Sequence, residues 1–402
     1  MTTDKKDKIL NVPDLRFPEF YEEWDKSIIE NHFDLYSGNT PSRLDKENFI
    51  GDVNWITSGE LKEHYIGDTK EHISETVANE NNLKVLPVGT FVIAIYGLEA
   101  EGVRGTGSIT TRKSTISQAC MAFTPIGKIS NEFLYSWYKK HGNVIGTKYA
   151  QGTKQQNLSY DIIAKFPIHY PSKQEQEKLN KFITLLDDRI STQSRAIQQL
   201  QSLISGITQK VSKHPSAQKT MLSEILTERN EKNKDLLPVY SVSVSEGVVN
   251  QVEYLGRSFA AKDTSNYNVV HQGDIVYTKS PTGDFPFGIV KRSDVGNNVA
   301  VSPLYGVYQP NNDAIGIYLH YYFCSPFNAR NYLHKLIQKG AKNTINITNQ
   351  RFLENVGPIP EAHILEKYVR LMNVLADKLV LEKDLLLQLQ KQKQYLLKTM
   401  FI

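Results

Sequence analysis

The sequence predicts an α+β protein in which two mixed α/β domains are each followed by a long helix, so that the chain is an internal repeat. Two observations predict this class. The stretch from Pro171 to Val211 aligns with the stretch from Pro360 to Met400, and both carry heptads. Residues 12–170 and 213–359 instead alternate short β-type runs with turn-rich segments. The order along the chain is therefore globular, helical, globular, helical.

Both long segments place apolar residues on two lines of positions four and three residues apart, which is the spacing of a coiled-coil seam. In the first segment the seam holds Leu179, Ile183, Leu186, Ile190, Ile197, Leu200, Ile204 and Ile207. In the second segment it holds Met372, Leu375, Leu379, Leu386, Leu389 and Leu396. Gln193 and Glu382 take equivalent seam positions, where a polar pair either fixes the register or is a solvated defect. Pairing of the two helices is the simplest way to bury these residues, and the alternative is that each helix packs on its own domain.

Turn and strand patterns set the expected boundaries. The domains are expected at residues 1–170 and 213–359, and the long helices at residues 171–212 and 360–402. Within the domains, short helices are expected near residues 130–140, 159–164, 316–336 and 349–354. Long polar loops separate the β-type runs, and such loops are where binding residues usually lie.

Composition narrows the class of protein. The chain has 402 residues and only two cysteines, Cys120 and Cys324, which favours a reducing compartment over a disulfide framework. No apolar run approaches the roughly 20 residues that span a bilayer, and the start, MTTDKKDKIL, lacks the apolar stretch of a signal peptide. We therefore expect a cytoplasmic protein without a membrane partner. The net charge of +4 permits a polyanion partner without establishing one.

The sequence lacks the local signatures of common catalytic and metal sites. There is no GxxxxGK[ST] phosphate loop, no Asp/Asn-Pro-Pro-Tyr string, no HExxH and no paired CxxC. The glycines of GVRGTG are wrongly spaced for a dinucleotide site. We expect no catalytic residue, no metal site and no cofactor in this chain, because any active site would have to be assembled from unmarked residues.

Several strings resemble type I restriction specificity subunits. The opening NVPDLRFPEFYEEW and the following SGNTPSR look like the start of that family's first target-recognition domain. FPIHYPSKQEQEKLNKFITLLDDRI is similar to its central conserved region. The likeness covers essentially the whole chain. The second half departs from the pattern, because its helix begins PEAHILEKYVRLM, with His363 and Ile364 where an acidic residue and a glutamine are expected.

The resemblance implies a non-catalytic subunit with a pseudo-twofold arrangement. Antiparallel helices would separate two target-recognition domains, each reading one half of a gapped site in double-stranded DNA. The helices would dock two methyltransferase subunits that use S-adenosylmethionine. Two translocating nuclease subunits that use ATP and Mg²⁺ would complete the complex. Two other classes stay open: a stand-alone DNA-binding or scaffolding protein that dimerises through its coiled coil, and an unrecognised enzyme that acts on nucleic acid.

Base and phosphate contacts require Arg, Lys, amide and hydroxyl side chains on loops. In the first domain the candidates are Thr40, Ser42, Arg43, Ser58, Tyr96, Arg104, Thr106, Arg112, Lys113, Gln118, Lys154 and Gln155. In the second they are Lys262, Lys279, Thr282, Arg292, Lys339, Lys342 and Asn343. Lys154 with Gln155 and Lys342 with Asn343 recur at nearly equivalent places in the repeat. Arg104 is expected to read one half-site, whereas Lys154 is expected to contact phosphate.

Overall fold

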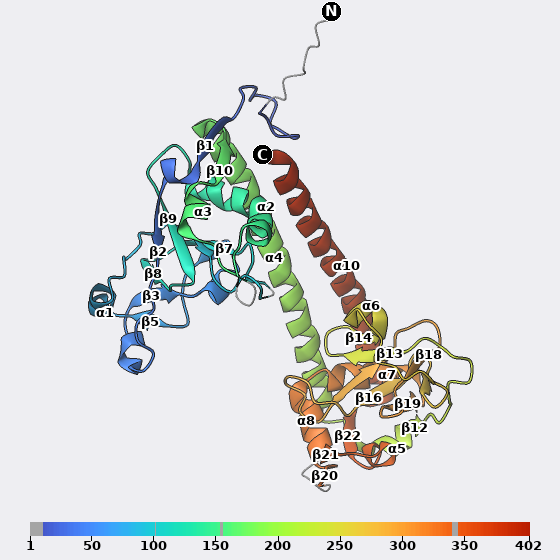
Figure 1. Cartoon of the computed structure of the whole chain (residues 1–402). Coiled ribbons are helices and arrows are strands. Elements are labelled where there is room, and N and C mark those ends of the chain that lie inside the picture. Colours follow the sequence, from blue (N-terminus) through green and yellow to red (C-terminus); the bar gives the residue numbers. More distant parts are fainter. Residues whose placement is uncertain (1–10, 101, 153–155, 340–344) are drawn as a thin grey trace, which may run out of the picture. The chain divides into compact units, whose positions relative to one another are not determined.

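The computed structural model shows two compact units (Figure 1). It describes residues 11–100, 102–152, 156–339 and 345–402. Unit 1 comprises Met1–Gln193 and Leu385–Ile402, and unit 2 comprises Ser194–Asp384. The two long helices, α4 (Lys173–Ser212) and α10 (Ala362–Met400), each contribute one end to each unit. The structure confirms the predicted α+β class.

Unit 1 is built on a five-stranded sheet in the order β2-β9-β6-β7-β4, in which only the β4–β7 pair is parallel. Its strands are β2 (Phe33–Ser37), β9 (Cys120–Pro125), β6 (Phe91–Ala94), β7 (Gly107–Thr110) and β4 (Tyr65–Ile66). A three-stranded sheet has the order β5-β3-β8, with β5 (His72–Ile73), β3 (Val53–Ile56) and β8 (Ser114–Ile116). Strands β1 (Asp25–Ile28) and β10 (Pro167–Tyr170) form an antiparallel pair. All four residues of β6 are buried, which explains why its sequence is apolar without alternation.

Besides the ends of α4 and α10, unit 1 contains the helices α1 (Glu75–Glu80), α2 (Asn131–Lys148), α3 (Tyr160–Ala164) and the 3₁₀ turns η1 (Ile29–Asn31), η2 (Lys46–Phe49) and η3 (Ser58–Glu60). The α-helices α1, α2 and α3 each begin at a serine side chain that accepts a backbone hydrogen bond. Ser130 caps α2, because its Oγ accepts a hydrogen bond from the backbone N–H of Phe133 at 3.2 Å. From this cap α2 runs across β6 and β7 and buries Phe133, Leu134 and Trp137 in the core of the unit.

Unit 2 contains a four-stranded antiparallel sheet in the order β12-β19-β16-β17. Its strands are β12 (Leu226–Glu228), β19 (Gly306–Pro310), β16 (Ile275–Thr278) and β17 (Ile289–Arg292). Four further strand pairs join β11 (Gln218–Met221) to β22 (Val356–Ile359), β13 (Tyr240–Ser243) to β14 (Gly247–Asn250), β15 (Asn268–Val270) to β18 (Val299–Val301), and β20 (Gln338–Lys339) to β21 (Ile345–Asn346). The short helices are α5 (Leu222–Ile225), α6 (Gln251–Leu255), α7 (Asp313–Phe323), α8 (Pro326–His334) and α9 (Asn349–Phe352).

The sequence predicts one helix near residues 316–336, but the structure has two, α7 and α8. Ser325 separates them and caps α8, with its Oγ 3.4 Å from the backbone N–H of Asn328. Pro326 follows at the first turn of α8, a position that tolerates proline because its missing N–H would have no helical partner there. This capping serine followed by proline explains the break.

Strand pairing repeats between the units, which is the structural counterpart of the sequence repeat. The antiparallel pairs β1–β10, β2–β9, β9–β6 and β6–β7 of unit 1 correspond to β11–β22, β12–β19, β19–β16 and β16–β17 of unit 2. Helix α2 covers β7 as α7 covers β17. Each unit therefore has the same central sheet and the same covering helix.

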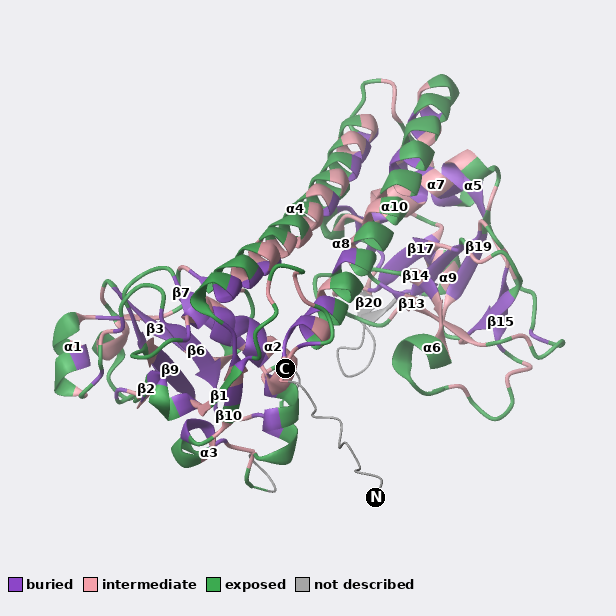
Figure 2. Cartoon of the chain, turned by 90° about the horizontal axis from the view of Figure 1, so that it is seen from above, coloured by how far each residue is buried: buried purple, intermediate pink, exposed green. Residues whose placement is uncertain are grey.

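The predicted seam residues of the described helices are all buried or half-buried. At the unit 1 end, Leu179 and Ile183 of α4 share one core with Leu396 of α10 and with the sheet of that unit. At the unit 2 end, Ile204 of α4 shares a core with Met372 of α10. The two arrangements expected for the helices thus occur together, because each helix end packs on its unit and on the other helix. Figure 2 shows exposed residues on the remaining faces of both helices.

Polar contacts fix the helix pairing inside each unit. Lys393 of α10 forms an ion pair with Asp187 of α4 in unit 1. In unit 2 the hydroxyls of Thr208 and Tyr368 are 2.8 Å apart. A later residue of α4 thus contacts an earlier residue of α10, which is the order that antiparallel helices require.

Candidate nucleic-acid interface

The described part of the chain shows no cluster of metal-ligand side chains, because no three His, Cys, Asp or Glu residues in it gather as metal ligands would. Within the same residues, no helix is long and apolar enough to cross a membrane. The candidates for function that the sequence predicts are polar side chains, most of them on loops.

One group of predicted DNA-binding residues surrounds the β5-β3-β8 sheet of unit 1. Its members are Thr40, Ser42, Arg43, Ser58, Arg112 and Lys113. The loop that holds Thr40 is tied to β8, because the backbone N–H of Asn39 donates to the carbonyl of Ile116 at 3.2 Å. Arg112 and Lys113 are exposed on the turn between β7 and β8. The structure thus gathers at one sheet residues that lie up to about seventy positions apart in sequence.

Arg43 is held in place by its surroundings. Its guanidinium makes two hydrogen bonds to the Glu71 carboxylate, at 2.7 and 2.9 Å, and lies 4.6 Å from the ring centroid of Phe49 and 5.1 Å from that of Trp55. The hydrogen bonds from Arg43 lower the pKa of Glu71. Because both ends of the fork are occupied, Arg43 would have to leave Glu71 before it could make a bidentate contact with guanine.

A second group lies where β6 ends and β7 begins. Tyr96 and Gln118 are exposed, whereas Arg104 and Thr106 are half-buried. The backbone N–H of Ile95 donates to the carbonyl of Ala119 at 2.9 Å, which brings Tyr96 and Gln118 to the same edge. Lys154 and Gln155 belong to this part of the sequence but lie outside the described residues.

Arg104 is more constrained than the sequence suggests. Its Nη2 donates to Gln156 Oε1 at 2.8 Å, and its side chain packs on Gly146 of α2, where an added Cβ would lie 2.7 Å from Arg104 Cγ. Gly146 therefore makes room for the arginine. These contacts position the guanidinium beside Gln156, and they would change if Arg104 turned to a base.

The structure does not bring the unit 2 candidates to one place. Lys279 and Thr282 follow β16, at one end of the β16–β17 hairpin, whereas Arg292 pairs with Ile275 at the other end. Arg292 forms ion pairs with Asp294 and Asp313. Burial lowers the pKa of Lys279, and the charge of Glu228 opposes that shift.

The remaining unit 2 candidates fall elsewhere. Lys262 is exposed on the loop before β15, and Lys339 ends β20. Lys342 and Asn343 lie outside the described residues.

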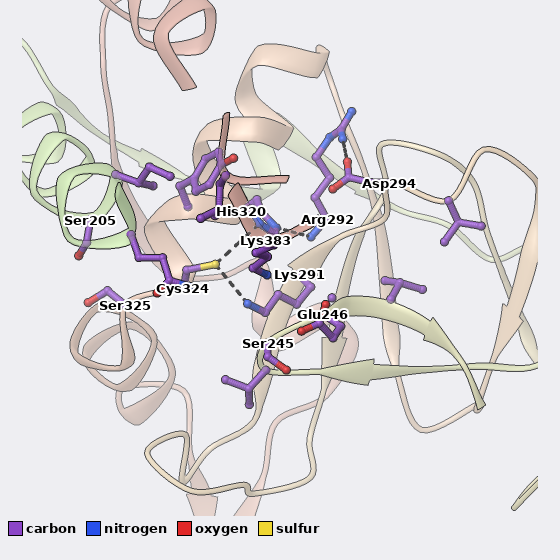
Figure 3. Close-up of a pocket in the computed structure, with 18 residues that line it drawn as sticks. Ser205, Ser245, Glu246, Lys291, Arg292, Asp294, His320, Cys324, Ser325 and Lys383 are labelled. Atoms are coloured by element: carbon purple, nitrogen blue, oxygen red, sulfur yellow. Dashed lines mark hydrogen bonds and ion pairs between the residues drawn. The ribbon is translucent and has the colours of Figure 1, made fainter. Parts of the chain in front are cut away.

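Unit 2 also contains a cavity of about 610 Å³ that sequence reasoning missed (Figure 3). Its wall includes Lys291 and Arg292 of β17 and His320 of α7. Lys291 Nζ donates to Cys324 Sγ at 3.2 Å, and the backbone N–H of Arg292 donates to His320 Nδ1 at 3.1 Å. Burial, followed by the charge of Lys291, lowers the pKa of His320 to about 4. No local motif joins these residues, which come from separate elements, so the sequence carried no signal for the cavity.

One protein-family model matches the first repeat of the chain. A model described as the type I restriction modification DNA specificity domain matches residues 21–202, which include the sheets of unit 1 and most of α4. The match covers 182 of the 402 residues and ends inside the long helix rather than at the edge of the sheet domain.

Two curated relatives of similar sequence are named as specificity subunits. The MjaIX specificity subunit of a type I restriction enzyme from Methanocaldococcus jannaschii is 26% identical over 178 residues, 43% of this chain and 40% of that protein. The HindI specificity subunit from Haemophilus influenzae is 26% identical over 157 residues, 38% of this chain and 32% of that protein. The match thus spans less than half of the length of either relative. Both relatives are named for specificity, which is a non-catalytic role.

Solved structures share the fold over nearly the whole chain. The crystal structure of a type I restriction-modification S subunit from M. genitalium has a TM-score of 0.56 at 15% identity and covers 97% of this chain and 99% of that one. A chain from a study of complex assembly and conformational transition of the type I R-M system has a TM-score of 0.53 at 12% identity, covering 93% and 96%. At these identities the likeness shows the fold. The second repeat thus shares the fold of S subunits although the family model ends at residue 202.

Proposed function

We propose that this chain is the DNA sequence-specificity subunit of a type I restriction-modification complex, in which each unit reads one half of a gapped site. The repeated strand pairing carries this proposal, because unit 2 reproduces the central sheet and covering helix of the specificity domain in unit 1. Two recognition units in one chain suit a site with two parts. The exposed loop residues around the β5-β3-β8 sheet are the proposed DNA contacts of unit 1.

We further propose that the outer face of α10 docks a methyltransferase subunit. Apolar side chains that are 39–71% exposed recur along this face at helical spacing, namely Leu371, Val374, Leu381, Leu385 and Tyr395. The corresponding face of α4 exposes Leu185 and Leu203. Exposed apolar rows of this kind mark protein interaction sites. Two methyltransferase subunits would supply adenine methylation with S-adenosylmethionine, and two translocase subunits would use ATP and Mg²⁺. Such a complex would act in the cytoplasm.

Methylome mapping tests the function. The chain is co-expressed with its cognate methyltransferase in a host that lacks methylated adenine, and modified adenines are mapped across the genome. We expect a gapped motif with one methylated adenine on each strand, which disappears when this chain is left out. An ungapped motif would contradict recognition by two units. A soluble complex without any modification would favour the scaffolding alternative.

The docking face has its own test. Val374→Glu with Leu381→Glu should abolish co-purification of the methyltransferase, because two carboxylates would be buried without partners at the contact. Lys378→Glu, on the same face, places a carboxylate at a position that is already charged and serves as the matched control. Retention of the methyltransferase by the double variant would place its docking site elsewhere.

A further inference from the structure

The imidazole of His64 in unit 1 is enclosed on both faces and at both ring nitrogens. Its ring stacks on Tyr65 with centroids 4.1 Å apart and on Tyr135 with centroids 3.9 Å apart, and the planes differ by 7° and 2°. Nε2 lies 2.9 Å from Glu132 Oε2, and Nδ1 lies 3.3 Å from Asp187 Oδ2. Only 9% of the side chain is exposed. The ring has little freedom to move without breaking one of these contacts.

The partners of His64 come from three other elements of unit 1. Glu132 lies in the first turn of α2, Asp187 lies on α4, and Asp187 also forms the ion pair with Lys393 of α10. His64 immediately precedes β4, and its carbonyl accepts a hydrogen bond from the N–H of Ile109 in β7 at 2.8 Å. The ring therefore connects the β4 edge of the five-stranded sheet to α4, and through Asp187 to the segment of α10 in this unit.

This geometry favours the doubly protonated imidazolium. Two carboxylates face the two ring nitrogens, and only the charged ring has an N–H for each of them. Burial alone would lower the pKa of His64, but the carboxylates of Asp187 and Glu132 outweigh burial, so that the pKa is raised. The other charged groups around the cluster are Glu63 beside the strand, Lys139 on α2, Asp188 on α4 and Lys393 on α10.

The segment that follows β4 contacts two predicted DNA-binding residues, Arg43 and Arg112. Residues 67–71 leave the strand directly, and Glu71 binds Arg43 through two hydrogen bonds. Asp68 lies 3.5 Å from Arg112. Any shift of β4 would therefore move the partners of Arg43 and Arg112.

We propose that His64 is a positioning residue for DNA recognition by unit 1, which holds β4 and the 67–71 segment in register with the adjoining helix segments of that unit. The inference rests on the proposed function. It assigns His64 no contact with DNA. Its effect on recognition passes through Arg43 and Arg112, and it depends on the charge of the ring.

The test uses the full chain in complex with its methyltransferase. Binding is measured to a duplex carrying the mapped site and to two duplexes in which one or the other half-site is scrambled, from about pH 6 to about pH 8.5. The variants are His64→Gln, which lacks the charge, and His64→Arg, whose planar guanidinium stays charged and stacks on aromatic rings. His363→Gln is the control, because His363 is 64% exposed at the start of α10.

Discrimination at one half-site should fall about threefold or more as the pH rises above about 6.5 in the native chain. Across the whole pH range, His64→Gln should show the weaker discrimination that the native chain has at high pH. His64→Arg should show the stronger discrimination that the native chain has at low pH, and His363→Gln should show the native pH profile. Equal losses at both half-sites, or a pH step that persists in His64→Gln, would overturn the proposal.

A complex that discriminates at neither half-site would instead overturn the proposed function. Thermal unfolding of the same chain then still tests the cluster. A loss of stability above about pH 6.5 that is absent in His64→Gln supports the positioning contacts, and an identical profile in both chains contradicts them.

Discussion

The two units share a central sheet and differ at its outer edge. In unit 1, β4 pairs with β7, and His64 joins that edge to the helix segments of the unit. In unit 2, β17 occupies the position of β7 and is the last strand of its sheet, and Lys291 and Arg292 of that strand line the cavity. One edge is therefore extended by a further strand and a charge network, whereas the last strand of the other sheet lines a cavity. The two units thus share the central sheet and its covering helix, but they differ in what lies beside the strand that β7 and β17 represent.

The largest effect should come from truncating each core in turn. Phe133 packs on Trp24 and Phe401 in unit 1, and Phe323 packs on Tyr332 in unit 2. Phe133→Ala and Phe323→Ala should each cost about 3–5 kcal/mol, because both rings are fully buried. Hydrogen exchange should show faster exchange in the unit that carries the change. The exposed Phe327→Ala is the control, and loss of protection in both units from either change would show that they unfold together.

Acid should lower the stability of unit 2 through the protonation of His320. His320 is neutral in the folded chain because its pKa is lowered to about 4, while the unfolded chain takes up a proton below about 6.5. Stability of unit 2 should therefore fall as the pH drops from about 6.5 to about 4, by on the order of 3 kcal/mol. His320→Gln should remove this part of the slope in urea unfolding followed across pH.

Unit 1 provides the comparison on the alkaline side. The pKa of His64 is raised, so its contribution is complete below about pH 6.5 and is lost as the pH rises through the folded value. A His320→Gln chain with an unchanged acid slope would show that groups other than His320 set that slope.

The two cysteines should differ in how fast a thiol reagent alkylates them. Cys120 of unit 1 is fully buried, and burial raises the pKa of its thiol to about 12. Cys324 lines the cavity of unit 2. Iodoacetamide should alkylate Cys324 on the order of 100-fold faster than Cys120, because Cys120 has to wait for local unfolding. Peptide mass spectrometry with Cys324→Ser as the control measures both rates, and equal rates would mean that the cavity does not admit the reagent.

The smallest effect concerns the caps of the covering helices. Ser130 caps α2 and also accepts from Asn180 Nδ2 of α4 at 3.1 Å. Asn312 caps α7 by accepting from the N–H of Ile315 at 3.0 Å. Asn312→Ala should cost about 1 kcal/mol, and Ser130→Ala should cost more because a second hydrogen bond is lost. A lower urea midpoint for Asn312→Ala than for Ser130→Ala would show that the hydrogen bond from Asn180 to Ser130 does not add to stability.

Periodic features of the molecule were predictable, and contacts between distant single residues were not. The heptads predicted the burial of Ile183 and Leu396 because a helix repeats its face regularly. The break before α8 also had a local signal in Ser325 and Pro326. His64 and Asp187 meet only through the fold, and no pattern in the sequence joins the two residues. For the same reason Arg43 could be named as a candidate, whereas its partner Glu71 could not.

The division of each long helix between two cores bears on how such chains can be recombined. A junction at the edge of a sheet domain, near residue 170 or 213, would separate strands from the helix ends that complete their core. Junctions near Gln193 and Leu385 would instead carry each core over whole, with both of its helix ends. Exchange of one unit for that of a relative should therefore preserve folding best when the crossovers fall in mid-helix, and the heptad register is then the feature that the two parents must share.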